Sequence, residues 1–542
     1  MRLAAFVLAL AGVAWAQYVP VRPGGAVDLA ATGEADLVAT VDGGCTFQAI
    51  DCIGGSTGWR AGFIGGRWPE EKLNALAELI FSTELDGQGN PKGVGFSGWR
   101  IEIGAGTAFQ GSEGVASGIE MPERRSPCYL WQGRYHWENC RGHTWWLRKA
   151  HEYKVASITG YANSPPVFWT KNGKGYKTER SMDSNLGEGH YEDFARFLAT
   201  VAGHFEREGT PFHYISPCNE PQWDWAMDPA KARQEGTPWR NDQIAPLVRA
   251  LNAELGKRQV VGTRVLITEA ATLGYLAAPA GADDFALASS DQVRALWDPA
   301  SENYVGNLPY VAGHVAGHGY FTDDPKQLAA ARERLRRRIE EVNPNLDYWQ
   351  SEYCILGEYN DKIADAEEGF LRLARVIHAD FAVGNAAAWF WWATFSGRKP
   401  GEMPRYTLVG TYDLAPDFSD GKWWATKNLW VMGNWSRFVR PGMLRVGVER
   451  SDKAGPAATV EDLMLSAYRS PRDGAVVVVA VNYGLAARTV KLENRGLAGA
   501  PRRWVPYVTS IEHDLAAGKE LTAEPIVVIP RRAVVTLVGL PQ

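Results

Sequence analysis

The sequence predicts an α/β fold, a (β/α)8 TIM barrel with a C-terminal β-sandwich packed against its side. Two observations support this prediction. From about residue 45 to 400, short β-like runs alternate with segments of helical periodicity, which is typical of repeated βα units around a parallel sheet. After about residue 405, β-like runs follow one another and are separated by turn signals such as residues 471–474, which is typical of a sandwich.

The barrel region contains seven candidate strands, each a short apolar or aromatic run. They cover residues 98–103, 155–161, 212–216, 265–269, 310–314 or somewhat later, 348–353 and 386–392. The clearest helix covers residues 325–342, where apolar residues recur at spacings of three and four. Residues 191–205 and 370–381 show the same periodicity. This alternation predicts that each helix connects two neighbouring parallel strands.

The C-terminal region contains six candidate strands without helices between them. They cover residues 463–468, 475–482, 488–493, 504–509, 526–529 and 534–538. Residues 26–41 are also β-like, and we expect them to pair with this C-terminal sheet. The predicted divisions are a signal peptide (1–16), an N-terminal strand segment joining the sandwich (17–44), the barrel (45–404) and the β-sandwich (405–542).

The first residues have the pattern of a secretory signal peptide. A charged start at Met1 and Arg2 precedes an apolar run over residues 3–13 and the small-x-small sequence of residues 14–16. A membrane anchor needs about 20 apolar residues, and neither this segment nor any other stretch qualifies. We therefore expect a secreted or extracytoplasmic protein that begins at Gln17 and does not span a membrane.

Composition narrows the classes of partner. Hydrophobic residues make up 45% and charged residues 22% of the chain, which excludes the profile of a disordered protein. The balance of 57 Lys and Arg against 62 Asp and Glu leaves no positive field for nucleic acid. The 22 tryptophans exceed both tyrosine and phenylalanine, and indole rings suit stacking on sugars as well as core packing.

Export would permit disulfides among the six cysteines. Cys128 and Cys140 flank an aromatic loop and are predicted to be bridged, and Cys45 and Cys52 are close enough in sequence to close a second small loop. Metal binding is disfavoured because no C-x-x-C and no H-E-x-x-H pattern occurs. We expect no metal.

Two glutamates follow or end candidate strands, where barrel active sites gather. Glu220 follows Asn219 in an Asn-Glu-Pro sequence, and Glu352 ends an aromatic strand. They are 352 − 220 = 132 residues apart, which is about three βα units and places them across the barrel mouth from one another. Each alone is more often a surface group.

Together, the two glutamates have the chemistry of glycosidic bond cleavage. One carboxyl group protonates the leaving oxygen while a second acts at the anomeric carbon. Trp223 and Trp225 would form platforms for sugar rings. No G-x-S-x-G elbow, P-loop or dinucleotide fingerprint occurs, so serine hydrolysis and nucleotide chemistry are disfavoured and no cofactor is expected. A non-catalytic carbohydrate-binding barrel is the alternative from a different class.

Several segments, in their order along the chain, resemble glycoside hydrolase family 30 of the retaining barrel clan. They are WRIEIGAG (99–106), ANSPP (162–166), SPCNEP (216–221), HGY (318–320), QSEY (350–353), AWFWW (388–392) and NWSRFVRPG (434–442). The last resembles the junction of the family's barrel with its side β-sandwich. One departure is Ile101-Glu102, where family members often have Tyr-Asn, so Glu102 adds a carboxylate near the site.

The resemblance implies roles for individual residues. Glu220 would be the acid/base and Glu352 the nucleophile, Asn219 would bond the neighbouring sugar hydroxyl, and Arg100 and Tyr320 would hold the nucleophile ionised. The remaining substrate contacts would be Trp223, Asn163, Trp169, His318, and Trp391 or its neighbour Trp392. The choice between the two tryptophans stays open because strand residues alternate in direction.

The implied substrate is a β-linked polysaccharide or oligosaccharide. The NEPQW and QSEY sequences resemble the endo-β-1,6-galactanase-like branch of the family most. Hydrolysis of β-1,6-glucan, of xylan, or of β-glycosides from chain ends stays open within the same chemistry, as does the oligomeric state. A retaining reaction further predicts that the two catalytic carboxyl groups lie about 5 to 5.5 Å apart.

Overall fold

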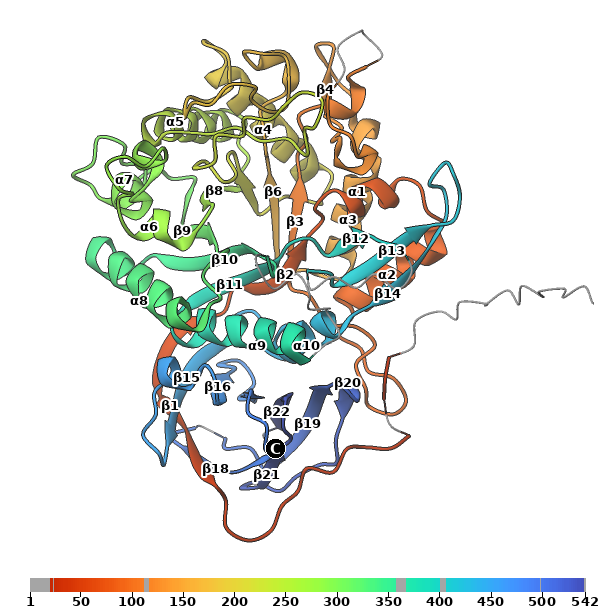
Figure 1. Ribbon diagram of the computed structural model, residues 1–542, viewed down its shortest axis with the longest axis vertical. Helices are drawn as coiled ribbons and strands as arrows, with labels where there is room; N and C mark the ends of the chain where they lie inside the picture. Colours follow the sequence, from red (N-terminus) through yellow and green to blue (C-terminus); the bar gives the residue numbers. More distant parts are fainter. Residues whose placement is uncertain are drawn as a thin grey trace, which may run out of the picture.

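The computed structural model describes residues 20–22, 24–111, 117–356, 367–399, 406–497 and 499–540. The predicted signal peptide (1–16) and the predicted domain boundary at 404/405 lie outside these residues. The described chain forms a barrel with surrounding helices and, below it in Figure 1, a separate β-rich region. No helix in the described part of the chain is both long and apolar enough to cross a membrane.

Eight parallel strands close into a barrel in the order β10-β11-β2-β3-β6-β7-β8-β9, which confirms the predicted fold class. The strands are β2 (Cys52–Ser56), β3 (Gly98–Glu102), β6 (Ser157–Tyr161), β7 (Tyr214–Ser216), β8 (Arg264–Ala270), β9 (Val311–His318), β10 (Asp347–Tyr353) and β11 (Ala386–Trp391). Seven of them coincide with candidate strands of the sequence. The candidate strand expected at 310–314 or somewhat later is β9, which begins at residue 311. The eighth, β2, was not predicted.

The glycines of β2 explain why it was missed. Its sequence, Cys-Ile-Gly-Gly-Ser, has the composition of a turn. In the barrel, however, a Cβ atom on Gly54 would lie 1.8 Å from the carbonyl oxygen of Gly98 on β3. The close approach of two neighbouring strands therefore requires glycine here, and that requirement exists only in the closed barrel.

Helices surround the barrel. They are α1 (Arg60–Gly65), α2 (Glu70–Phe81), α3 (Arg141–Glu152), α4 (Tyr191–Arg207), α5 (Asn241–Lys257), α6 (Leu273–Ala277), α7 (Gln292–Trp297), α8 (Pro325–Val342), α9 (Glu367–Ala382) and α10 (Lys427–Ser436). The predicted helix of residues 325–342 is α8. Asp324 caps it by accepting a hydrogen bond from the backbone N–H of Lys326 (3.0 Å), and Leu328, Leu335 and Ile339 bury its apolar face.

The β-rich region is a nine-stranded sheet in the order β20-β19-β22-β17-β16-β15-β1-β18-β21. Its strands are β1 (Leu37–Ala49), β15 (Leu444–Arg450), β16 (Leu463–Arg469), β17 (Val476–Asn482), β18 (Arg488–Arg495), β19 (Arg503–Ser510), β20 (His513–Ala517), β21 (Ile526–Ile529) and β22 (Ala533–Leu540). β21 packs on β17 and β22 without pairing with them, so the sheet folds over itself into two layers.

The N-terminal strand β1 lies inside this C-terminal sheet. It pairs antiparallel with β15 and parallel with β18. Leu37, Ala39 and Val41 are buried in the interior of the sandwich, while the residues between them are partly exposed. This alternation of buried and partly exposed residues is typical of a strand with one buried face, which is why the sequence predicts a strand here.

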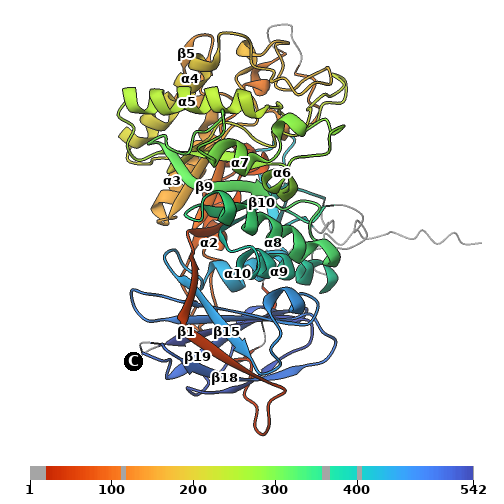
Figure 2. The same cartoon turned by 90° about the vertical axis from the view of Figure 1, so that its left-hand side faces the viewer.

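Two helices separate the barrel from the sandwich. α9 and α10 lie between the two bodies in both views (Figures 1 and 2). On β17, Val477 and Val479 belong to the core that these helices share with the barrel, whereas Val476 and Val478 belong to the interior of the sandwich. Both faces of β17 are thus buried, and the sandwich is joined to the barrel by a continuous apolar core.

Smaller strands complete the architecture. β12 (Phe395–Gly397), β13 (Val409–Asp413) and β14 (Gly421–Ala425) form a three-stranded sheet, and β4 (Leu130–Trp131) pairs with β5 (Arg134–Tyr135). The three-stranded sheet follows the last barrel strand, and its residues Phe395 to Gly397 form part of the cavity described below.

The predicted disulfides are not formed, because all six cysteines are free thiols. Cys45 on β1 is exposed to solvent, whereas Cys52 on β2 is buried against barrel residues such as Trp349. The two side chains therefore lie in different environments. Cys128 and Cys140 are both buried in the main core, and burial raises the pKa of both thiols. They act as small apolar core residues.

Candidate active site

The carboxyl ends of the barrel strands surround a cavity of about 580 Å³. Both predicted catalytic glutamates, Glu220 and Glu352, line it. Of the other predicted site residues, those that also line it are Asn163, Asn219, Trp223 and Tyr320. Residues from four different strand ends therefore meet in one cavity, at the face where TIM barrels carry their active sites.

Glu352 is held by two donors. Arg100 Nη1 lies 2.8 Å from one carboxylate oxygen, and the Tyr320 hydroxyl donates to the other at 2.9 Å. Arg100 is fully buried inside the barrel, where Ser56 accepts a further hydrogen bond from it. These two donors, one on each oxygen, fix the orientation of the carboxylate.

Glu220 has a different environment. It follows β7, its backbone is in the left-handed region (φ 45°), and its backbone N–H donates to the carbonyl of Glu269 (2.8 Å). Its carboxylate accepts a hydrogen bond from His318 Nδ1 at 3.0 Å. Burial raises the pKa of Glu220, and the negative charge of Glu352 adds to this, while His318 opposes it.

A third carboxylate, Glu269 at the end of β8, connects the two glutamates and was not predicted. Its Oε2 atom lies 3.2 Å from Arg100 and 3.3 Å from His318 Nε2. Burial opposes ionisation, but Arg100 and His318 together lower the pKa of Glu269 to about 2. Glu269 ends a candidate strand of the sequence, as Glu352 does, and that position was the signal for it.

His318 is a buried cation in this network. Burial alone would lower its pKa, but Glu352 and the hydrogen bonds to Glu220 and Glu269 raise it to about 10. The buried groups thus alternate in charge from His318 through Glu269 and Arg100 to Glu352, and Glu220 is hydrogen-bonded to His318 at the end of this chain. Such a chain holds both cavity carboxylates in place through the interior of the barrel.

The two cavity carboxylates are close together. An oxygen of Glu220, an oxygen of Glu352 and a ring nitrogen of His318 all lie within 4.8 Å of one another. His318 Nδ1 is 3.0 Å from Glu220 and 3.6 Å from Glu352, so the imidazolium sits on the inner side of the pair. The opposite side of both carboxylates faces the cavity.

Three predicted substrate contacts lie elsewhere. Arg100 and His318 are fully buried beneath the carboxylates and reach the cavity only through them. Trp169 lies in the three-residue helix after β6, where it packs on Phe168, His190 and Phe197. It does not line the cavity. These side chains orient or support the site instead of contacting its open space.

The tryptophan that lines the cavity is Trp392, not Trp391. Trp391 ends β11 and is fully buried against Tyr353 and Trp389, whereas Trp392 is partly exposed in the cavity. Successive strand residues point in opposite directions, so only one of the two can face the cavity. Trp59 packs edge-on against Trp392, with ring centres 5.1 Å apart, and also lines the cavity.

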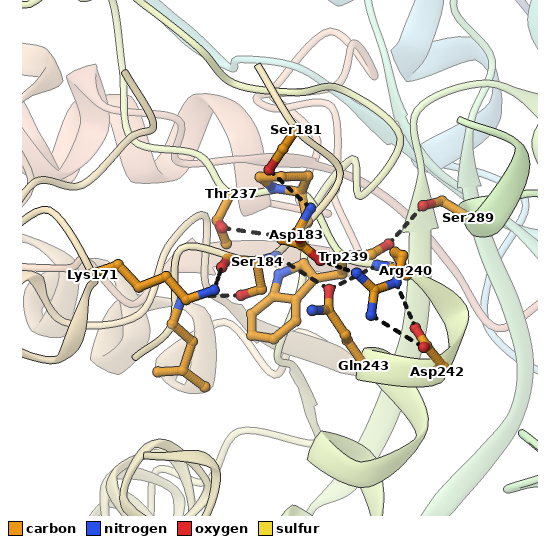
Figure 3. Close-up of polar contacts among 12 residues, drawn as sticks. Lys171, Ser181, Asp183, Ser184, Thr237, Trp239, Arg240, Asp242, Gln243 and Ser289 are labelled. Atoms are coloured by element: carbon orange, nitrogen blue, oxygen red, sulfur yellow. Dashed lines mark hydrogen bonds and ion pairs between the residues drawn. The ribbon is translucent and has the colours of Figure 1, made fainter. Parts of the chain in front are cut away.

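The loop that carries Glu220 and Trp223 is anchored at the start of α5. Arg240 forms ion pairs with Asp183, in the loop after β6, and with Asp242 (2.9 Å). The backbone N–H of Ser184 donates to the Gln243 side chain at 3.1 Å. Figure 3 shows these contacts, which tie the loops after β6 and β7 together and fix one wall of the cavity.

Two groups of side chains in the described residues have spacings that suit a metal ion, namely Glu220 with His318 and Glu352, and Asp51 with His314 and Asp347. In the first group both ring nitrogens of His318 are engaged by carboxylates, Nδ1 with Glu220 and Nε2 with Glu269. The second group lies at the opposite ends of the strands, because Asp51 precedes β2 and Asp347 begins β10. The absence of a cofactor stays a prediction.

An eight-stranded barrel whose mouth holds two facing carboxylates in an aromatic-walled cavity defines a glycoside hydrolase. The chain belongs to O-glycosyl hydrolase family 30, whose family model matches residues 37–399. This agrees with the resemblance of its sequence motifs.

Solved structures of similar fold cover nearly the whole chain. A conserved exported protein from Bacteroides fragilis is 29% identical, with a TM-score of 0.83 over 92% of this chain and 100% of that one. Xylanase C from Talaromyces cellulolyticus is 18% identical, with a TM-score of 0.63 over 93% and 99%. An endo-β-1,6-glucanase is 14% identical, with a TM-score of 0.61 over 96% and 100%.

Proposed function

We propose that the protein cleaves β-glycosidic bonds with retention of the anomeric configuration, with Glu352 as nucleophile and Glu220 as acid/base. The observation that supports this most is the pairing of two carboxylates in opposite environments. Glu352 is ion-paired with Arg100, whereas burial and the charge of Glu352 raise the pKa of Glu220. The first chemical step requires an ionised nucleophile and a protonated acid, and we assign these two states to Glu352 and Glu220.

The reaction has two steps. Glu352 attacks the anomeric carbon while the proton of Glu220 passes to the departing glycosidic oxygen, so the glycosidic C–O bond breaks and a glycosyl ester of Glu352 forms. Glu220, now ionised, takes a proton from water, whose oxygen attacks the anomeric carbon and releases Glu352. Each step inverts the anomeric carbon, so the product keeps the starting configuration.

The geometry favours this reaction over inversion. Inverting enzymes separate their carboxyl groups by about 6.5 to 9.5 Å to accommodate a water between them. Oxygens of Glu220 and Glu352 approach within 4.8 Å, which supports the shorter separation of a retaining pair. The pair also argues against a purely sugar-binding barrel, because binding alone does not require two carboxylates in unlike environments.

The proposed substrate is a β-linked polysaccharide, with β-1,6-galactan as the first to test. The support for galactan is the resemblance of the sequences around Glu220 and Glu352 to the galactanase-like branch. Xylan and β-1,6-glucan are the alternatives, since proteins of the same fold are named as a xylanase and an endo-β-1,6-glucanase. We further propose export, supported by the pattern of residues 1–16 and by the exported protein of similar fold.

The test is the release of reducing sugar from β-1,6-galactan, β-1,6-glucan and xylan by the purified protein. Proton NMR of the first product should show the retained anomer. Glu352→Gln should abolish turnover but keep oligosaccharide binding, and Glu220→Gln should slow poor leaving groups far more than activated aryl glycosides. An inverted first product, or full activity of Glu352→Gln, would contradict the proposal.

A further inference from the structure

Glu102 is a buried carboxyl group beside the cavity that the proposed reaction does not use. It ends β3, and only 1% of its surface is exposed. Its Oε1 atom accepts a hydrogen bond from the Asn163 side-chain amide at 2.8 Å. Asn163 lines the cavity with Glu220 and Glu352, so Glu102 contacts a residue of the cavity wall without lining that cavity itself.

The hydrogen bond to Glu102 determines which end of the Asn163 side-chain amide points away from the cavity. An asparagine side chain has a donating NH2 group and an accepting carbonyl oxygen. The NH2 group donates to Glu102. The carbonyl oxygen Oδ1 receives no hydrogen bond from the described residues, and it is not among the buried atoms that lack a partner. The cavity wall therefore offers an acceptor at this point.

Besides Asn163, the groups near Glu102 include Ser126, Arg125 and His143, with which it lines a second cavity of about 500 Å³. The charged neighbour on the loop after β7 is Glu235, a buried carboxyl that binds the backbone N–H of Ala105 (2.9 Å) and the Thr107 hydroxyl (2.6 Å). Arg100, two residues earlier on β3, is directed to Glu352 and Glu269. No cation of the described chain pairs with Glu102, so its free energy of ionisation depends mainly on burial.

On β6, Tyr161 is the register partner of Glu102, and from the barrel's first loop Thr57 accepts the Glu102 backbone N–H at 3.3 Å. Burial raises the pKa of Glu102 to about 7, with the hydrogen bond from Asn163 opposing the rise. Burial, with the charge of Glu102 added, raises the pKa of Glu235 to about 8. Both carboxyls thus titrate in the neutral range.

We propose that Glu102 is a positioning residue that holds the Asn163 amide with its carbonyl oxygen toward the cavity, and so selects a sugar that donates a hydroxyl hydrogen there. This inference rests on the proposed function and adds a determinant of substrate choice to it. When Glu102 is protonated, its hydroxyl can donate to Asn163 Oδ1 instead, and the amide then presents its NH2 group. The orientation is thus coupled to the protonation of Glu102.

The test compares Glu102→Gln with the matched control Glu235→Gln, which neutralises the neighbouring buried carboxyl that does not contact Asn163. Kinetics are measured on β-1,6-galactan, or on xylan or β-1,6-glucan if that is the polysaccharide cleaved. We expect Glu102→Gln to raise KM about tenfold, with kcat changed less than about twofold, because a glutamine can present either end to Asn163. At a pH above the pKa of Glu102, where that carboxyl is ionised in both proteins, Glu235→Gln should leave KM unchanged.

Two further readouts separate positioning from a general structural effect. The KM of the unaltered protein should rise as pH falls through about 7, and this dependence should be absent in Glu102→Gln. Asn163→Ala should raise KM as much as Glu102→Gln, and the double variant no further, since the two residues act as one unit. Asn163→Ala keeps the test informative if Glu102→Gln fails to fold.

Unchanged KM in a folded Glu102→Gln variant, or additive effects in the double variant, would overturn the inference. These results differ from a failure of the proposed function. In that case none of the three polysaccharides is cleaved by the unaltered protein, or Glu352→Gln stays active.

Discussion

Glu269 lies 3.2 Å from Arg100 in the interior of the barrel, beneath the cavity and out of reach of solvent. Through Arg100 it is connected to Glu352, and through His318 it is connected to Glu220. A carboxylate that contacts neither the cavity nor a substrate thereby supports both residues that we propose to carry out the reaction. Four predictions follow from this network and from the surrounding groups.

Replacing Glu269 with glutamine should lower kcat by about 10²-fold while KM changes little. The amide cannot balance the charges of Arg100 and His318, so both proposed catalytic carboxylates shift from their positions, and misplacement on the ångström scale costs about this factor. The loss of this one negative charge leaves a positive charge of the buried network uncompensated, which should also destabilise the fold by about 3 to 5 kcal/mol.

Steady-state kinetics and thermal unfolding measure both effects of Glu269→Gln. The matched control is Glu188→Gln, the same change at an exposed residue of the loop after β6, which should leave both quantities unchanged. Wild-type kcat in Glu269→Gln would show that the network does not position the site.

Replacing His318 with glutamine should move the alkaline limb of the kcat/KM profile to higher pH. The alkaline limb reports loss of the proton from the acid, which we propose to be Glu220. His318 stabilises the ionised form of Glu220 and thus lowers its pKa against the effect of burial. Without the imidazolium, Glu220 keeps its proton to higher pH. A limb that stays in place or moves to lower pH would contradict this assignment.

The neighbouring tryptophans Trp391 and Trp392 should respond differently to replacement by alanine. Trp392→Ala removes a cavity-lining ring and should raise KM about tenfold, the loss of one sugar-stacking surface, with little change in melting temperature. Trp391→Ala leaves a hole in the core and should cost about 3 to 5 kcal/mol of stability. Each variant is the control for the other, and the reverse pattern would assign the cavity to Trp391.

Thermal stability should fall as pH rises from about 5 to 10. The folded pKa values of Glu102, near 7, and Glu235, near 8, are raised above the ordinary glutamate value near 4.5, so their stabilisation is present below 4.5 and is lost through 7 to 8. His318, whose pKa is raised to about 10, stabilises fully below about 6.5 and loses this through 10.

The check on this pH dependence is the melting temperature across that range. Glu235→Gln should flatten the part of the curve between pH 5 and 8, because a glutamine does not titrate. A wild-type melting temperature that rises over the same range would show that burial does not raise the pKa values of these two carboxyls.

The acid side of the same curve has a separate cause. Arg100 and His318 lower the pKa of Glu269 to about 2, so its contribution to stability is present above about 4.5 and is lost as pH falls through 2. Unfolding in strong acid should therefore involve this residue.

Much of the fold was predictable because it depends on local pattern. The candidate strands at 98–103 and 386–392 are β3 and β11, and the helix at 325–342 is α8, since period and capping are properties of neighbouring residues. β2 was missed because its glycines are required by a strand that is distant in sequence. The predicted disulfides are not seen in the structure, where all six cysteines are free thiols, because spacing along the chain alone does not determine pairing.

The sequence by itself determined the class of barrel, the two glutamates at strand ends and the aromatic surroundings, because each is a pattern of residues close together in the chain. Only the tertiary structure decided which tryptophan faces the cavity, and that Arg100, His318 and Glu269 form one buried network. These three residues lie on three different strands, and the closure of the barrel brings their side chains within hydrogen-bonding distance. Their pKa values follow from that contact and from burial, neither of which a local pattern specifies.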